Sequence, residues 1–568
     1  MFLLNPQQYA REHPDQKTRD IMLALIEFFE DKGKDSLKED DRERVWYEEF
    51  LSFLSERRIL AQMLTPTEHG RDASCRWDTY RNSEFSEILG FYGLCYWYTW
   101  QVSVLGLGPI WMSDNAQAKK RAAALLEDGA IFAFGLSERT HGADVYSTDM
   151  VLTDSGSDGP GAYVANGEKY YIGNANVARM VSTFGKFEDG EYCFFAADSQ
   201  SEAYELRRNV VNSQSYVANY ALHDYPVGED DLLARGDAAW NMALNTVNIG
   251  KFNLGWASIG ICTHAFYEAM NHAGHRRLYG MLVTDMPHVK RMLTDAYVRL
   301  VAMKLYGLRC SDYMRTASLT DRRYLLFDPT MKMKVTTQGE VTVDLLWDVI
   351  AAKGFEKDTY FEMAVRDIRA LPKLEGTVHV NVMLIAKFAP NYLFNPTSEL
   401  PEIGHVDAQR NDDFLFDQGP TRGLGKILFH DYNLAYDAFD LPNVNVFKQQ
   451  IVAFKRMLVE AAPTQAQSAD PDFTLAVGEL FTSIVYGQLI LENARTHGID
   501  DDLIDRLFDC FIRDFARLAL DLRNLATVSD AQLEHCLDML RRPVADAERN
   551  DRVYAEVMAH RDRYEMPR

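Results

Sequence analysis

The sequence lacks several features that would assign it to a class directly. No stretch holds the ~18 consecutive apolar residues that a membrane-spanning helix needs. Residues 1–16 contain only a short apolar run with no basic region before it, unlike a secretion signal. The 7 cysteines are scattered and include no CxxC pair, which argues against a zinc site and against a disulfide framework. We therefore expect a cytoplasmic protein with reduced thiols, without bound metal and without integral membrane association.

Positive charge is also scarce. The chain has 60 Lys and Arg residues against 83 Asp and Glu residues, which gives a net charge of −23. A surface this acidic repels the phosphates of nucleic acids, so we expect no nucleic-acid partner. An anionic substrate would need a local basic patch.

The spacing of the apolar residues changes along the chain. Spacings of three and four predict helices before residue 130, one ending at Gly33 and another capped by Ser113 or Asp114. Residues 82–111 are apolar almost all round, which predicts a helix that is buried or lines an apolar pocket. Short β-branched and aromatic segments follow, and the Asn166–Gly167 pair among them predicts a hairpin turn.

These patterns predict an α+β, mostly helical protein whose 568 residues exceed one ordinary core. The expected parts are an N-terminal helical domain (1–129), a middle β domain (130–235), a helical domain (236–390), an irregular connector (391–442) and a C-terminal helical extension (443–568). The connector is assigned from its many Pro, Gly and Asp residues.

Five motifs that occur in order between about residues 20 and 390 resemble motifs of the acyl-CoA dehydrogenases. They are "FAFGLSERTHGADV" (132–145), "NGEKYYIGNANVA" (166–178), "TVNIGKFNLGWASIG" (246–260), "HAGHRRLYG" (272–280) and the segment 345–381 that contains "RDIRALPKLEGT". The resemblance implies a helical domain, a β domain and a four-helix domain with FAD between them. It also implies an acyl-CoA substrate. The added C-terminal helices are similar to those of very-long-chain acyl-CoA dehydrogenases and acyl-CoA oxidases.

The resemblance also implies which residues contact the cofactor and the substrate. Those expected to contact FAD, some of them across a subunit interface, are Phe134, Leu136, Ser137, Tyr171, Gly173, Arg276, Tyr279, Asp348, Ala352, Gly376, Thr377 and His379. Those expected near the acyl-CoA are Ala143, Asn248 and Lys251. A flat aromatic such as Tyr171 suits stacking on a planar ring, and the Arg276 guanidinium suits phosphate oxygens.

Several of these positions depart from the family pattern. Gly173 stands where a threonine is common, and Ala143 stands where a serine is usual. Ala351 and Ala352 replace a pair of glycines, and Asp348 replaces a glutamine. In place of a basic arginine the chain has Lys251, which neutralises a phosphate without gripping it through two parallel donors.

Glu375 is the expected catalytic base. In the family the base is a glutamate either before this Gly-Thr pair or on the helix near the CoA-binding basic residue, and the second location falls on Gly250, which has no carboxylate. Forming an α,β double bond requires a base for the α-proton and a flavin to accept the β-hydride. Burial near Leu374 and Val378 is expected to raise the pKa of Glu375 toward neutrality.

Four functions remain open at this point. They are a dehydrogenase that passes electrons to an electron-transfer flavoprotein, an acyl-CoA oxidase that uses O2, a dehydrogenase of acyl groups bound to a carrier protein, and a flavin-free scaffold. A homodimer is expected in view of the C-terminal extension. The aromatic run at 90–100 either closes an acyl pocket against long chains or fills the core.

Overall fold

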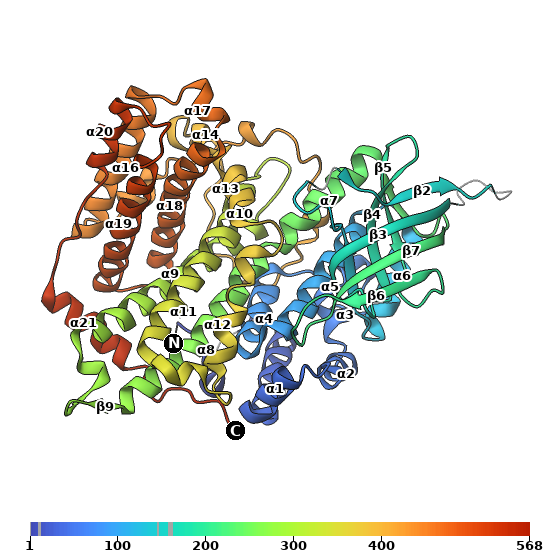
Figure 1. Ribbon diagram of the computed structural model, residues 1–568, viewed down its shortest axis with the longest axis horizontal. Helices are drawn as coiled ribbons and strands as arrows, with labels where there is room; N and C mark the ends of the chain where they lie inside the picture. The colour runs from blue at the N-terminus through green and yellow to red at the C-terminus, as the bar shows by residue number, and fades with distance from the viewer. Residues whose placement is uncertain (1, 10–12, 145–146, 157–162) are drawn as a thin grey trace. The chain divides into compact units, whose positions relative to one another are not determined.

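The computed structural model of the chain describes residues 2–9, 13–144, 147–156 and 163–568 (Figure 1). It separates into two compact units. The mixed unit comprises Arg11–Asn253, Asp407–Arg422 and Pro567–Arg568, and the helical unit comprises Met1–Ala10, Leu254–Val406 and Gly423–Met566. Together they confirm the expected fold class, since helices predominate and one mixed sheet holds most of the strands.

The mixed unit begins with helices whose bounds agree with the main breaks in the sequence pattern. They are α1 (Gln16–Glu43), α2 (Glu48–Glu56), α3 (Ile59–Leu64), α4 (Thr79–Tyr92), α5 (Leu94–Met112) and α6 (Ala116–Glu127), and α7 (Gly236–Gly250) follows the strands. Helical geometry breaks at Gly33 as predicted, with φ 72°, although a second helical segment continues α1. Figure 1 shows α1 to α6 in blue shades.

The expected cap of α6 is wrong. The capping side chain is Asn115, which accepts a hydrogen bond from the Ala118 N–H at 2.9 Å. Ser113 does not cap this helix because its hydroxyl donates back to the Ile110 carbonyl at 2.8 Å, at the end of α5. The sequence placed the cap in the correct region, residues 113–115. Within it, Ser113 bonds to the end of α5, and Asn115 caps the start of α6.

One twisted sheet forms the rest of the mixed unit. Its strands are β1 (Phe132–Gly135), β2 (Val151–Asp154), β3 (Tyr163–Gly173), β4 (Met180–Phe187), β5 (Tyr192–Ala197), β6 (Tyr204–Asn209), β7 (Val217–Val227) and β8 (Leu232–Arg235). The order is β6-β7-β3-β2-β4-β5-β8, and β1 pairs with β4 in parallel. Inward side chains such as Ala165, Ile172 and Tyr220 form its buried core.

The predicted hairpin at Asn166–Gly167 is also wrong. Both residues lie inside β3, at a bulge opposite β7, where Gly167 has φ 150°. The Asn166 side chain accepts from the Asp224 N–H at 2.9 Å and donates to the Asp224 carboxylate at 3.0 Å. Asn166 and Gly167 therefore form a bulge that pairs with β7, instead of a turn that reverses the chain.

The helical unit is larger and contains the C-terminal extension. Its helices are α8 (Phe252–His275, from Leu254 on), α9 (Pro287–Arg315), α10 (Tyr324–Thr330), the π-helix η5 (Met331–Val335), α11 (Thr336–Ile350), α12 (Tyr360–Asp367), α13 (Val378–Ala386), α14 (Ala389–Phe394), α15 (Asn433–Tyr436), α16 (Pro442–Glu460), α17 (Gln465–Ala469), α18 (Pro471–Thr496), α19 (Asp501–Arg523), α20 (Asp530–Asp538) and α21 (Ala547–Met558). A small hairpin, β9 (Arg277–Leu278) with β10 (Met281–Leu282), follows α8.

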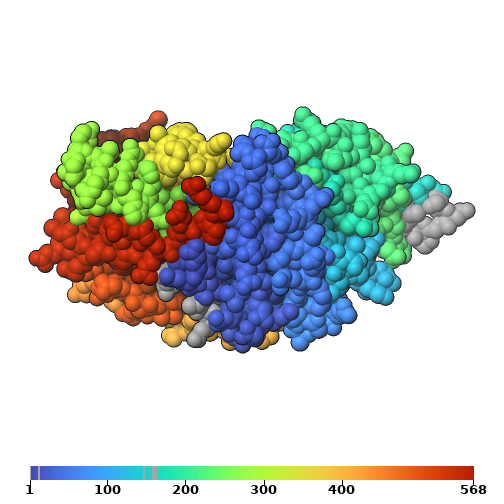
Figure 2. Space-filling model, turned by 90° about the horizontal axis from the view of Figure 1, so that it is seen from below, coloured from blue at the N-terminus to red at the C-terminus, as the bar shows by residue number. Residues whose placement is uncertain are grey.

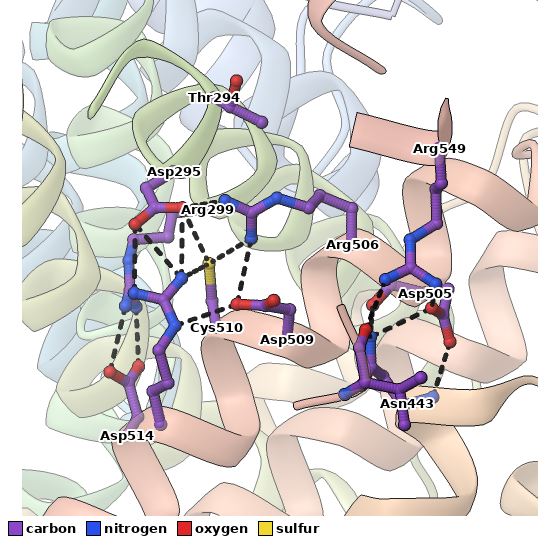
Figure 3. Close-up of polar contacts among 12 residues, drawn as sticks. Thr294, Asp295, Arg299, Asn443, Asp505, Arg506, Asp509, Cys510, Asp514 and Arg549 are labelled. Carbon is purple, nitrogen blue, oxygen red and sulfur yellow. Dashed lines mark hydrogen bonds and ion pairs between the residues drawn. The ribbon is translucent and has the colours of Figure 1, made fainter. Parts of the chain in front are cut away.

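Buried ion pairs join the extension to the earlier helices of this unit (Figure 3). Asp295 on α9 accepts hydrogen bonds from Arg513 at 3.1 Å and from Arg506, both on α19. Burial alone would raise the pKa of Asp295, but the two guanidinium groups outweigh it and hold that pKa below its usual value. Nearby, Arg299 grips Asp514 through two donors, at 2.6 and 2.9 Å.

The helix α18 is a core element of the same unit. Among the described residues it is the one helix long and apolar enough to cross a membrane. Most of its side chains are buried, however, including Leu480, Ile484 and Leu489. A helix that is apolar all round and packed on every side is typical of a protein core.

The end of α11 stores backbone strain that a single substitution should release. Ala351 has φ 55° and ψ −139°, a conformation that favours glycine, and its side chain is exposed. We predict that Ala351→Gly raises the free energy of unfolding by about 1 kcal/mol, because relief of strain exceeds the entropy cost of glycine. Urea denaturation of the purified protein measures this change.

Ala352→Gly is the matched control. Ala352 is the adjacent exposed alanine and does not have a positive φ. This variant should lower the free energy of unfolding by roughly 0.5–1 kcal/mol. Equal destabilisation by both glycines would show that Ala351 is unstrained.

Candidate active site

In the mixed unit, the end of β1 and the end of β3 bring two sets of predicted residues together. Phe134 lies in β1, and Leu136 and Ser137 follow it directly. The Tyr170 N–H donates to the Ser137 carbonyl at 3.0 Å, and the Ser137 hydroxyl donates to the Tyr170 carbonyl at 3.1 Å. Ser137 is thus adjacent to the segment that carries Tyr171 and Gly173.

Tyr171 has the geometry expected of a stacking residue. It sits at a second bulge of β3, between Tyr170 and Ile172, with φ 67°. The bulge leaves its side chain 46% exposed, while the neighbouring Ile172 is buried. A large aromatic ring held by strained backbone with an open face fits the planar ring of a flavin.

A buried ion pair that sequence reasoning missed joins Glu138, directly after Ser137, to β3. Lys169 is fully buried on β3, and its ammonium donates to the Glu138 carboxylate at 2.7 Å. The Thr148 hydroxyl and the Asp149 N–H also donate to Glu138, at 2.6 and 2.7 Å. Burial alone would raise the pKa of Glu138, but Lys169 and these donors hold it below its usual value. The pair was detectable in principle, since both residues lie inside recognised motifs.

The predicted substrate residues lie in three different environments. Ala143 is exposed in the loop after β1, Asn248 is half-buried near the end of α7, and Lys251 is buried directly after that helix. Gln101 on α5 secures this junction by donating to the Gly250 carbonyl at 2.8 Å and accepting from Asn253 at 3.0 Å. Gln101 lies in the aromatic helix, and its role was not apparent from the sequence.

In the helical unit, Glu375 occupies a tightly held turn between a 3-10 helix (Leu371–Lys373) and α13. Its side chain is half-buried, and its φ of 50° is uncommon for a residue other than glycine. Gly376 follows with φ 85°, which explains why glycine is needed there. The Thr377 hydroxyl caps α13 by accepting from the Val380 N–H at 3.5 Å.

Two buried side chains from other turns of helix bind the carbonyls of this segment. Asn381 donates to the carbonyls of Gly376 and Thr377, at 3.2 and 2.9 Å. Lys332, which lies in the π-helix and is fully buried, donates to the Pro372 carbonyl at 2.6 Å and to the Gly376 carbonyl. The Glu375 backbone is therefore held on both sides.

The remaining predicted residues of the helical unit are all exposed. Tyr279, with its side chain 95% exposed, lies at the tip of the β9–β10 hairpin. The other members of this exposed set are Arg276 at the end of α8, Asp348 and Ala352 at the end of α11, and Thr377 and His379 at the start of α13. Figure 2 shows the hairpin region, in light green, at the surface.

The glycine at position 173 is explained by packing. A Cβ built there would lie 2.6 Å from Val102 Cγ2 and 2.9 Å from the Tyr98 hydroxyl, so Tyr98 occupies the space a side chain would need. We predict that Gly173→Thr lowers the free energy of unfolding by about 1–3 kcal/mol through overpacking. Adding Tyr98→Ala should recover part of the loss, because the two positions share one space.

Denaturation curves of the two variants and of Gly404→Ala measure these effects. Gly404 has no atom within 4 Å of a built Cβ, so its substitution should leave stability nearly unchanged. Strict additivity of Gly173→Thr and Tyr98→Ala would contradict the shared-space explanation.

Comparison with known proteins supports the resemblance seen in the sequence. Residues 238–389 match the family described as "Acyl-CoA dehydrogenase, C-terminal domain". A probable acyl-CoA dehydrogenase, YngJ, of Bacillus subtilis is 23% identical over 295 residues, which cover 50% of this chain and 75% of that protein. The caffeyl-CoA reductase-Etf complex subunit CarC of Acetobacterium woodii is 23% identical over 319 residues, or 53% of this chain and 79% of that protein.

Solved structures show that the same fold extends over the C-terminal helices. A Bacillus anthracis acyl-CoA dehydrogenase complexed with FAD has a TM-score of 0.75 and 16% identity, and the match covers 98% of this chain and 96% of that one. The prolyl acyl carrier protein oxidase AnaB has a TM-score of 0.56 and 18% identity, covering 66% of this chain and 99% of that one.

The family match includes the turn that carries Glu375, and the fold agrees along nearly the whole length. Residues 238–389 thus belong to the acyl-CoA dehydrogenase C-terminal domain family, the chain has the acyl-CoA dehydrogenase fold, and the protein is an oxidoreductase that uses FAD.

Proposed function

We propose that the enzyme introduces an α,β double bond into an acyl-CoA thioester, with Glu375 as the base. The observation that supports this most directly is the geometry of the Glu375 turn. Its carboxylate projects from a half-buried, strained position whose backbone is held by Lys332 and Asn381. Residues other than glycine that are held at positive φ cluster at functional sites, where the surrounding contacts maintain the strain.

The reaction divides between the cofactor and the chain. FAD supplies the acceptor for the hydride that leaves Cβ. Glu375 takes the proton from Cα as the general base. Tyr171 would cover the flavin ring and exclude water, and Ser137 with its partner strand would orient that ring.

We also infer a homodimer in which the exposed set of the helical unit contacts the FAD of the adjoining subunit. The β9–β10 hairpin presents Tyr279 together with Leu278 and Met281, whose side chains are 38% and 45% exposed. Clustered exposed apolar side chains beside Arg276 suit an interface that receives a phosphate-containing cofactor. Their exposure in the single chain supports a role completed by a second copy.

The proposed electron acceptor is an electron-transfer flavoprotein, and the proposed substrates are fatty acyl-CoAs of β-oxidation in the cytoplasm. The similarity to CarC, a subunit of a caffeyl-CoA reductase-Etf complex, supports this acceptor. All 7 cysteines lie in described residues, are buried and form no disulfide, as suits a reducing compartment. The similarity to AnaB keeps an oxidase acting on a carrier-bound acyl group as the second candidate.

Glu375→Gln tests the proposed base. The variant should bind FAD and keep its visible flavin spectrum, yet its flavin should be reduced by acyl-CoA on the order of 10²–10⁴ times more slowly, because glutamine cannot accept the proton. Anaerobic stopped-flow spectroscopy with acyl-CoAs of graded length measures the rate. Reduction by dithionite is the control and should be unchanged. Flavin bleaching by acyl-CoA at the wild-type rate would refute the role.

Aerobic turnover distinguishes the dehydrogenase from the oxidase. The proposed dehydrogenase should transfer electrons to an added electron-transfer flavoprotein and release little hydrogen peroxide. Peroxide formed in a one-to-one ratio with oxidised thioester would favour the oxidase. Repeating the assay with acyl carrier protein thioesters separates the two carriers.

A further inference from the structure

The π-helix η5 connects the Glu375 turn with the C-terminal helices. It interrupts the helical run from α10 to α11 directly after Pro329, which has no N–H to donate to the helix ladder. The hydroxyls of Thr336 and Thr337 accommodate the altered ladder by donating to carbonyls within the π-helix, among them Met333 at 2.9 Å. A π-turn supported by side chains in this way often marks a functional position.

Two lysines of the π-helix are buried and point to different parts of the unit. Lys332 and Lys334 are 0% and 9% exposed. Residues two apart on a helix do not share a face, so the two ammonium groups lie on nearly opposite sides. A buried ammonium that loses its acceptors costs several kcal/mol, and each lysine therefore restrains the groups it binds.

Lys332 restrains the Glu375 turn. Its acceptors, the carbonyls of Pro372 and Gly376, lie on the two sides of Glu375 along the chain. If the turn moved outward, a fully buried charge would lose both of these acceptors at once. Hydrogen bonds from a charged donor are stronger than those between neutral groups, so such a movement is strongly opposed.

Lys334 anchors the π-helix to the extension. Its ammonium donates to the Ser483 hydroxyl on α18 at 3.3 Å. Burial lowers the pKa of Lys334, and Arg299 and Arg517 act in the same direction, whereas Asp514 and Glu479 favour its charged form. Helix α18, more than 100 positions later in the sequence, thus contacts the π-helix through Lys334.

We propose that Lys332 is a positioning residue for Glu375 and that the C-terminal helices, through Lys334, hold the π-helix that carries it. This inference rests on the proposed function, in which Glu375 is the base. It assigns the extension a part in catalysis, since a base displaced by 1 Å from its substrate carbon can lose on the order of 100-fold in rate.

The test compares three lysine variants of the full-length enzyme loaded with FAD. Lys332→Met should retain FAD, and its half-saturating acyl-CoA concentration should change by less than about threefold. Its limiting rate of flavin reduction should fall on the order of 10- to 100-fold, while dithionite reduces it normally. Lys334→Met should show the same pattern with a fall of roughly 3- to 10-fold. Lys373→Met, in the same turn but with its exposed side chain paired with Glu340, should match the wild type.

Two further variants, Lys332→Arg and Asn381→Ala, distinguish a loss of positioning from a general loss of structure. Lys332→Arg keeps the charge and the donors and should recover part of the rate. If Lys332→Met does not fold, Asn381→Ala releases the Gly376 carbonyl from its other donor and should lower the limiting rate in the same way. A wild-type limiting rate in Lys332→Met, or in Asn381→Ala when that variant replaces it, overturns the proposal. A wild-type rate in Lys334→Met overturns the part assigned to the extension.

Failure of this proposal is distinguishable from failure of the proposed function. If acyl-CoA no longer reduces the flavin of Glu375→Gln but reduces that of Lys332→Met at the wild-type rate, Glu375 remains the base. The positioning role of Lys332 is then wrong. If acyl-CoA reduces the flavin of Glu375→Gln at the wild-type rate, the proposed function is wrong. The positioning role of Lys332 is then wrong as well.

Discussion

A charge taken out of water must find its partners inside the fold, and this requirement organises both units of the protein. In the helical unit the ammonium of Lys332 finds two main-chain carbonyls beside Glu375. In the mixed unit the ammonium of Lys169 finds Glu138, and that pair joins the segment directly after Ser137 to β3. The segments expected to act in catalysis are therefore held by buried charges that lie outside the recognised base and stacking residues.

The C-terminal helices obey the same rule. Asp295 on α9 pairs with Arg506 and Arg513 on α19, and Arg299 on α9 pairs with Asp514 (Figure 3). The extension is therefore bound to α9 through charged groups that would be costly to bury without partners. Such pairs add little net stability compared with apolar packing, but they specify one arrangement of the helices. The position of α18 and α19 is consequently well defined relative to the π-helix.

Two departures from the family pattern, Gly173 and Ala351, have local structural features of their own. Gly173 is accompanied by Tyr98, whose ring and hydroxyl take the space beside it. Ala351 keeps a conformation suited to glycine even though it has a side chain. At Gly173 the Tyr98 side chain fills the space of the missing side chain. At Ala351 the backbone keeps a strained conformation. The same kind of substitution is thus accommodated in two different ways.

The sequence by itself determined the alternation of helical and β segments, the break at Gly33 and the location of Glu375 before a glycine, because periodicity and short motifs are local properties. Only the tertiary structure decided that Asn166 forms a bulge with Asp224 and that Lys332 binds the carbonyls around Glu375. These contacts join residues tens of positions apart. No local pattern encodes them, since the partner of a buried polar group is chosen by whatever the fold brings within hydrogen-bonding distance.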